Sequence, residues 1–248
     1  MPMADLSDIV AFCDQLLDVT MFDDYCPNGL QVEGRREVQS IVTGVTASQA
    51  LIDAAVDAGA DLVLVHHGYF WRGEAAPLVG MKGRRIRALM GAGISLLAYH
   101  LPLDAHPELG NNRQLGLRLG LPDATAVDGL MWGGEFPRVL SPKHLSALVG
   151  DTLGRVPLMV GPEHPVKRIA WCSGAAQSMI EQAAAGGFDA FISGEISEHT
   201  VHQARELGVL YLAAGHHATE RFGVQALGDK LGTRFGLQHR FVDIQNPV

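Results

Sequence analysis

Two adjacent histidines, His66 and His67, stand where the strand-like apolar run 61–65 ends. An unbroken apolar run is typical of a strand that is covered on both faces. Neighbouring residues of a regular strand point to opposite faces, but at a strand end the chain can twist so that both side chains converge. Because neutral imidazole is the commonest protein ligand for zinc, iron and nickel, the doublet predicts a metal site.

His216 and Glu220 are four residues apart, so in a helix over 214–221 they lie on one face, one turn apart. Asp104 adds a second carboxylate. Together with the doublet, these ligands exceed what a structural zinc needs, which is four ligands and usually thiolates. They are typical of two divalent ions, about 3.5–4 Å apart, that activate a water as nucleophile. The predicted metal ligands are His66, His67, Asp104, His216 and Glu220.

Two further residues are candidates for catalysis. Glu195 follows an apolar strand and could shuttle a proton, and His100 could do the same, bind metal, support a ligand or contact substrate. Tyr69, next to the histidine doublet, could hold substrate or simply pack. A lone histidine at a strand end is more often a hydrogen-bonded surface residue. Four other histidines are therefore assigned either to a polar rim or to solvated surface: His106, His199, His202 and His217.

The chain aligns with itself when it is shifted by 128 residues. Each copy predicts a strand, a helix that is closed by glycine, an aspartate and a second apolar strand, and each second strand ends in polar residues. All such units share this hydrophobic pattern, so the pattern alone does not require a duplication. The matched positions are Ile41 with Ile169, Gln49 with Gln177, Ile52 with Ile180, Ala55 with Ala183, Gly59 with Gly187, Asp61 with Asp189, and Leu64 with Ile192.

A His-x-x-x-carboxylate pair follows a further strand in each half. The pair is His100 with Asp104 in the first half and His216 with Glu220 in the second, at a shift of 116. This recurrence favours an internal duplication over a chance likeness of β-α-β units. In open α/β sheets, ligands collect at the carboxyl ends of strands, which is where all of these polar groups stand.

The fold class expected is α/β: two interlinked, internally repeated lobes with mixed sheets and a metal site between them. The first lobe is expected to comprise 1–120 and 205–248 and the second 121–204, although a single intertwined unit is an alternative. The segment 101–107 contains two prolines and predicts neither regular helix nor strand.

Composition narrows the functional classes. Of 248 residues, 47% are apolar, and the net charge of −8 argues against binding nucleic acid or anionic membrane. Cys13, Cys26 and Cys172 are too far apart for a thiolate zinc site and predict free thiols in a reducing cytoplasm. No signal peptide or membrane span is expected. Motifs of kinases, dinucleotide-binding dehydrogenases, serine hydrolases and zincins are absent.

Five motifs in order resemble one family, the dinuclear metal-binding GTP cyclohydrolase 1 type 2 homologues, and most of all its short bacterial YbgI-like members. The resemblance covers essentially the whole chain. It rests on Pro27-Asn28-Gly29-Leu30-Gln31-Val32-Glu33-Gly34, His66-His67-Gly68-Tyr69-Phe70-Trp71, His100-Leu101-Pro102-Leu103-Asp104, Gly110-Asn111-Asn112 and Gly215-His216-His217-Ala218-Thr219-Glu220.

The resemblance implies a two-metal site with the five ligands above, two interlinked α/β lobes and a ring-shaped homohexamer. It leaves two functions open. One is a metal-dependent hydrolase of a nucleotide-like small molecule, in line with the ring-opening activity on GTP after which the family is named. The other is a non-catalytic metal carrier or a metal-dependent assembly scaffold. A His and carboxylate donor set accommodates iron, zinc, manganese or nickel.

Overall fold

The computed structural model describes residues 3–248, which form two compact units. Among these residues, the first unit comprises those up to Leu109 and Gly223–Gln245, and the second comprises Gly110–Phe222 and Asn246–Val248. The predicted lobe boundaries differ from these, because strand β12 (Leu210–Ala213) hydrogen-bonds to β11 (Ala190–Ser193) and so brings its segment into the second unit. The confirmed part of the prediction is the class, a mixed α/β fold with mixed sheets.

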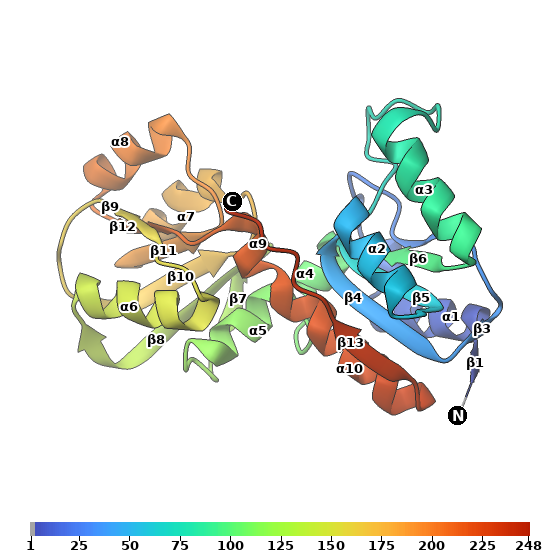
Figure 1. Cartoon of the computed structure of the whole chain (residues 1–248). Helices are drawn as coiled ribbons and strands as arrows, with labels where there is room; N and C mark the ends of the chain where they lie inside the picture. Colours follow the sequence, from blue (N-terminus) through green and yellow to red (C-terminus); the bar gives the residue numbers. More distant parts are fainter. Residues whose placement is uncertain (1–2) are drawn as a thin grey trace. The chain divides into compact units, whose positions relative to one another are not determined.

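The first unit is built on a five-stranded mixed sheet in the order β13-β4-β5-β6-β2 (Figure 1). Four strands run parallel, and β2 pairs antiparallel with β6 at one edge. A short ribbon of β1 and β3 lies beside it. The bounds are β1 Ala4–Asp5, β2 Gly29–Val32, β3 Glu37–Val38, β4 Ser40–Thr46, β5 Leu62–His67, β6 Ser95–Ala98 and β13 Gln238–Phe241.

Both faces of this sheet are covered, as the apolar run 61–65 predicts. Leu62 and Leu64 enter one buried cluster, and Val63 and Val65 enter another. The first cluster takes side chains from α1 and α10, and the second from α2 and α3. The helices are α1 Leu6–Leu16, α2 Gln49–Asp57, α3 Gly80–Ala92, α4 Leu101–Ala105 and α10 Arg221–Phe235, with a 3-10 turn at Val19–Met21.

The helix α4 corrects the prediction for 101–107. Pro102 lies in the first turn, where a missing N–H has no helical acceptor to lose, so the proline favours this helix start. His100 is the N-cap residue, and its carbonyl accepts the N–H of Asp104 at 3.1 Å. One helical turn therefore separates Asp104 from His100, which follows the end of β6.

The second unit contains a six-stranded mixed sheet in the order β7-β8-β10-β11-β12-β9 (Figure 1). Strands β10, β11 and β12 are parallel, and the other three pair antiparallel. The remaining bounds are β7 Thr125–Asp128, β8 Met131–Leu140, β9 Leu158–Val160, β10 Val166–Cys172, α5 Asn111–Arg118, α6 Pro142–Leu153, α7 Ile180–Ala185, α8 Glu198–Leu207 and α9 His216–Thr219, with a 3-10 turn at Gln177–Met179.

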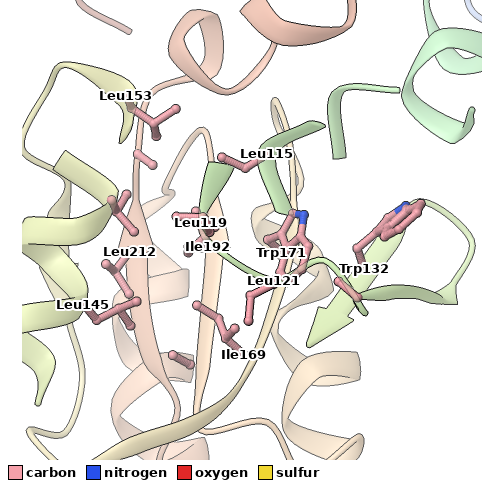
Figure 2. Close-up of a cluster of buried hydrophobic side chains, with 14 of the residues drawn as sticks. Leu115, Leu119, Leu121, Trp132, Leu145, Leu153, Ile169, Trp171, Ile192 and Leu212 are labelled. Carbon is pink, nitrogen blue, oxygen red and sulfur yellow. The ribbon is translucent and has the colours of Figure 1, made fainter. Parts of the chain in front are cut away.

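Trp171 is the largest fully buried side chain in the core of this unit. Figure 2 shows it among Ile169, Ile192 and Leu115. Its indole N–H donates to the carbonyl of Asn112 at 2.9 Å, which satisfies the one polar atom that the ring buries. The core therefore holds α5, which carries Asn112, against β10, the strand of Trp171.

The repeat predicted at a shift of 128 appears as identical strand register. Ile41 pairs with Leu62 in the first unit, and Ile169 pairs with Ala190 in the second. The two matched aspartates also make equivalent hydrogen bonds. The carboxylate of Asp61 accepts the N–H groups of residues 39 and 40, and that of Asp189 accepts those of residues 167 and 168. The duplication therefore extends to hydrogen bonds as well as to hydrophobic pattern.

The predicted shift of 116 for the His-x-x-x-carboxylate pairs is off by one residue. Ser95 pairs with Leu62, and Leu210 pairs with Ala190, so the third strands match at a shift of 115. His100 then corresponds to Gly215, the N-cap of α9, and not to His216. The two pairs are similar in sequence but do not occupy equivalent positions.

Two smaller expectations concern the rest of the chain. The three cysteines are free and buried, as their spacing predicts. Within residues 3–248, no helix combines the length and the apolar character that crossing a membrane requires.

Candidate metal centre

The histidine doublet lies at the end of β5 and is held by neighbouring strands. His66 is fully buried, and its Nδ1 donates to the carbonyl oxygen of Tyr99 at 2.9 Å. Nδ1 of His67 lies 3.2 Å from the hydroxyl of Thr46. The two rings are 4.7 Å apart, so the strand end brings both to one place, as predicted. A carbonyl only accepts, which fixes the proton of His66 on Nδ1 and leaves Nε2 as the atom for a metal.

Asp104 and His100 join the doublet. The Asp104 carboxylate is buried and lies 3.4 Å from Nε2 of His66. The ring of His100 lies 5.0 Å from that of His66 and 5.7 Å from that of His67. One ring nitrogen from each of the three histidines lies within 4.8 Å of the others, a spacing that a metal ion can bridge.

The orientation of His100 depends on a loop that the sequence did not single out as functional. Asp24 accepts from Nδ1 of His100 at 2.7 Å, and Asn28 accepts from the backbone N–H of His100 at 2.7 Å. Partial burial alone would raise the pKa of Asp24, but hydrogen bonds from His100 and Asn28 outweigh it and hold that pKa at about 2. Asp24 is therefore an ionised anchor for the imidazole. Sequence analysis named Asn28 only as part of a family motif and did not name Asp24.

In the second unit, His216 lies between two carboxylates. Its Nε2 is 3.1 Å from Glu220 and its Nδ1 is 2.7 Å from Glu195. Burial acts to lower the pKa of His216, but the hydrogen bonds and charges of Glu220 and Glu195 outweigh it and raise the pKa to about 9. Helix α9 with its C-cap residue Glu220 provides the one-turn spacing that the sequence predicts. The two carboxylates that face His216 suit a cation.

Glu195 contacts Nδ1 of His216. This contact gives Glu195 a more specific role than that of the proton shuttle that the sequence suggests. A carboxylate on Nδ1 fixes the tautomer and the ring orientation of a histidine whose Nε2 is a metal ligand. The same anchoring recurs at His66 through Tyr99 and at His100 through Asp24. The chemistry and the orientation of these donors therefore suit the binding of a metal ion.

Two glycines lie close to Glu220 and His216. A Cβ on Gly174 would lie 2.2 Å from Oε1 of Glu220, and the residue has φ +67°. A Cβ on Gly194 would lie 2.6 Å from the Cα of His216. Sequence reasoning missed both, although each follows a serine at a strand end.

We predict that Gly174→Ala lowers metal affinity by roughly tenfold, since the added methyl must displace Glu220 and strains the left-handed backbone. Metal titration monitored by calorimetry measures this. Gly154→Ala is the control, because Gly154 also has a positive φ and a Cβ there meets nothing within 4 Å. Equal affinities in the two variants would contradict the prediction.

The remaining candidates lie outside these clusters or serve packing. Tyr69 is buried and donates its hydroxyl proton to the Ala47 carbonyl at 2.7 Å, which favours the packing alternative. His199 and His202 are exposed on α8. Nδ1 of His106 accepts the N–H groups of Glu108 and Leu109, and burial lowers the pKa of this histidine. The backbone N–H of His217 donates to Val248.

Comparisons with known proteins find relatives over almost the whole chain. A relative from Allochromatium vinosum, named GTP cyclohydrolase 1 type 2 homolog, is 57% identical over 99% of this chain and 98% of its own length. A relative of the same name from Pseudomonas aeruginosa is 56% identical over 98% of both chains. A solved structure described as protein ybgI of unknown function has a TM-score of 0.95 and 48% identity, and covers 99% of this chain and 100% of its own.

The family model described as Duf34/NIF3 (NGG1p interacting factor 3) matches residues 4–247. This match spans both units and every residue of the two polar clusters. The resemblance inferred from the five sequence motifs is confirmed, and the chain belongs to the Duf34/NIF3 family.

Proposed function

We propose that His66, His67, Asp104, His216 and Glu220 together hold a pair of divalent ions, and that the protein is a metal-dependent hydrolase of a nucleotide-like small molecule. The observation that carries the proposal is the anchoring of the ring nitrogens. In His66 and His216, Nδ1 is bound by an acceptor, so Nε2 is the coordinating atom. The names of the relatives support a nucleotide as the substrate class.

When bound, such a pair of ions supplies an activated water and stabilises developing negative charge. The protein's own groups supply the rest. His100, held through Nδ1 by Asp24, keeps Nε2 for exchanging a proton with substrate. Glu195 keeps the ring of His216 in one orientation. Glu195 and Glu220 give the surroundings of His216 a negative charge. Bound cations would reverse this charge and so attract an anionic substrate.

The alternative function, a metal carrier or assembly scaffold, requires ions that leave readily. The burial of the ligands favours retention instead, since His66 is 0% exposed, Glu220 3% and Asp104 5%. A carrier is expected to expose its ligands to the acceptor protein. The hydrolase is therefore the function that the arrangement supports best.

The test is elemental analysis of natively purified protein, followed by a turnover screen of nucleotides with the metal found. Stoichiometric metal with hydrolysis of a nucleotide supports the proposal. Tightly bound metal without turnover of any nucleotide or phosphoester overturns the hydrolase and leaves the metal centre. Rapid transfer of metal to an added chelator, again without turnover, favours the carrier.

We also propose that the protein assembles as a ring-shaped homohexamer. Leu78, Val79 and Met81 are close in sequence and are 48%, 71% and 58% exposed, an apolar surface that a second copy of the chain could cover. Light scattering after size exclusion is expected to give a mass six times the 26.6 kDa of one chain. Val79→Lys should lower this mass, and an unchanged mass would exclude this segment from the contact.

A further inference from the structure

The turn after the histidine doublet has an unusual backbone. Phe70 has φ +65°, in the left-handed region that a bulky aromatic residue rarely adopts. Such strain persists only where the surroundings impose it, and it clusters at ligand-binding sites. The conformation therefore calls for an account of what holds the turn and of what it presents.

The carboxylate of one residue, Glu74, holds the backbone of the turn. Glu74 accepts the backbone N–H groups of Phe70 at 2.7 Å and of Trp71 at 3.2 Å. Lys82, whose side chain is 11% exposed, lies 3.5 Å from the same carboxylate and 5.6 Å from the centre of the Phe70 ring. The indole N–H of Trp71 donates to Gly68 at 3.2 Å. Backbone and side chain are therefore both fixed.

The turn is also tied to the loop that anchors His100. The backbone N–H of Arg72 donates to Tyr25 at 2.6 Å, and its guanidinium donates to Asp23 at 2.9 Å. These contacts connect the turn with the loop of Asp24, the partner of His100.

These contacts fix the position of one ring, the indole of Trp71. Trp71 lies 5.0 Å from His100 at an interplanar angle of 83° and 5.9 Å from His67. It remains partly exposed, whereas the chain's other two tryptophans, Trp132 and Trp171, are 5% and 0% exposed. A tryptophan that serves only packing has no need of a strained, carboxylate-braced turn at the rim of a histidine cluster.

We infer that Trp71 is a stacking platform for a planar heteroaromatic ring of the substrate, which it holds beside the histidine cluster. The inference rests on the proposed function and specifies its substrate class. Every heteroaromatic base has a flat face that an indole can cover, and base stacking on an aromatic side chain strengthens binding by roughly 5- to 150-fold. The strained turn fixes the indole before substrate arrives, so binding need not order it.

The experiment compares two probes on the full-length, metal-loaded protein by calorimetry: guanosine 5′-monophosphate, and ribose 5-phosphate, which lacks the ring. Trp71→Leu should weaken binding of the nucleotide by roughly 5- to 150-fold and leave ribose 5-phosphate unchanged. Trp71→Phe, which keeps an aromatic face, should recover most of the loss. Metal content is measured for each variant.

Equal weakening of both probes by Trp71→Leu, or no weakening, would overturn the inference and leave Trp71 as a packing neighbour of His100. Failure of the wild-type protein to prefer the nucleotide over ribose 5-phosphate would overturn it as well. Turnover is scored separately. Ring-dependent binding without hydrolysis would support the stacking platform while the hydrolase proposal fails, so the two failures are distinguishable.

Discussion

Glu220→Gln is expected to lower the affinity for divalent metal by at least about 100-fold, because it removes the charge of a predicted ligand while keeping its volume. The carboxylate is buried and lies 3.1 Å from Nε2 of His216. Ligand removal should cost more than the 10- to 100-fold that supporting residues typically contribute. Competition with a chromophoric chelator measures the affinity, and elemental analysis measures the number of ions lost.

The chain offers a matched control for this variant. Glu198 and His202 form another pair with the same four-residue spacing, at 3.1 Å, but both are exposed on α8. Glu198→Gln should leave metal affinity unchanged. Bound metal also stabilises the folded state in proportion to its affinity, so the rise of Tm on adding metal should be reduced or lost only in Glu220→Gln. An unaltered affinity in that variant would remove Glu220 from the ligand set.

The parts of the site that sequence could predict are those set by local geometry. His216 and Glu220 share a helical face, which follows from the helical period of 3.6 residues without knowledge of the rest of the fold. His66 and His67 converge because the strand ends there, since the strand period of 2.0 alone would point them to opposite faces. The register of the first two strands of the repeat was predictable as well, since a shift of 128 residues aligns them without gaps.

The missing parts depend on contacts between segments far apart in sequence. Asp24 meets His100 across 76 residues, and Gly174 meets Glu220 across a gap of 46 residues. No periodicity carries such a pairing. The shift of 116 failed for a related reason. It aligned residue types, whereas the structure aligns helix starts, and α9 begins with His216 itself where α4 begins after His100. Similar donors therefore reach similar clusters from positions that are not equivalent.

A final prediction tests the duplication through stability. Asp189→Ala is expected to destabilise the second unit by about 2–3 kcal/mol, since its carboxylate accepts the N–H groups of Lys167 at 2.7 Å and Arg168 at 2.8 Å. Hydrogen bonds to a charged group contribute about 1.5–3 kcal/mol each, and partial exposure of this aspartate reduces their sum. Urea unfolding followed by circular dichroism measures the change, with Asp151→Ala, on an exposed face of α6, as the near-neutral control.

The matched aspartate makes this test specific to the repeat. Asp61 accepts from residues 39 and 40 at 2.9 and 3.2 Å, so Asp61→Ala should destabilise the first unit by a similar amount. Its second bond is longer, which places its expected loss at the lower end of the range. Because each aspartate directly precedes a strand that ends in polar residues, β5 or β11, both losses should also weaken metal binding near the unfolding midpoint. A large loss of stability in one unit and none in the other would show that the two copies share a topology but that this aspartate stabilises only one of them.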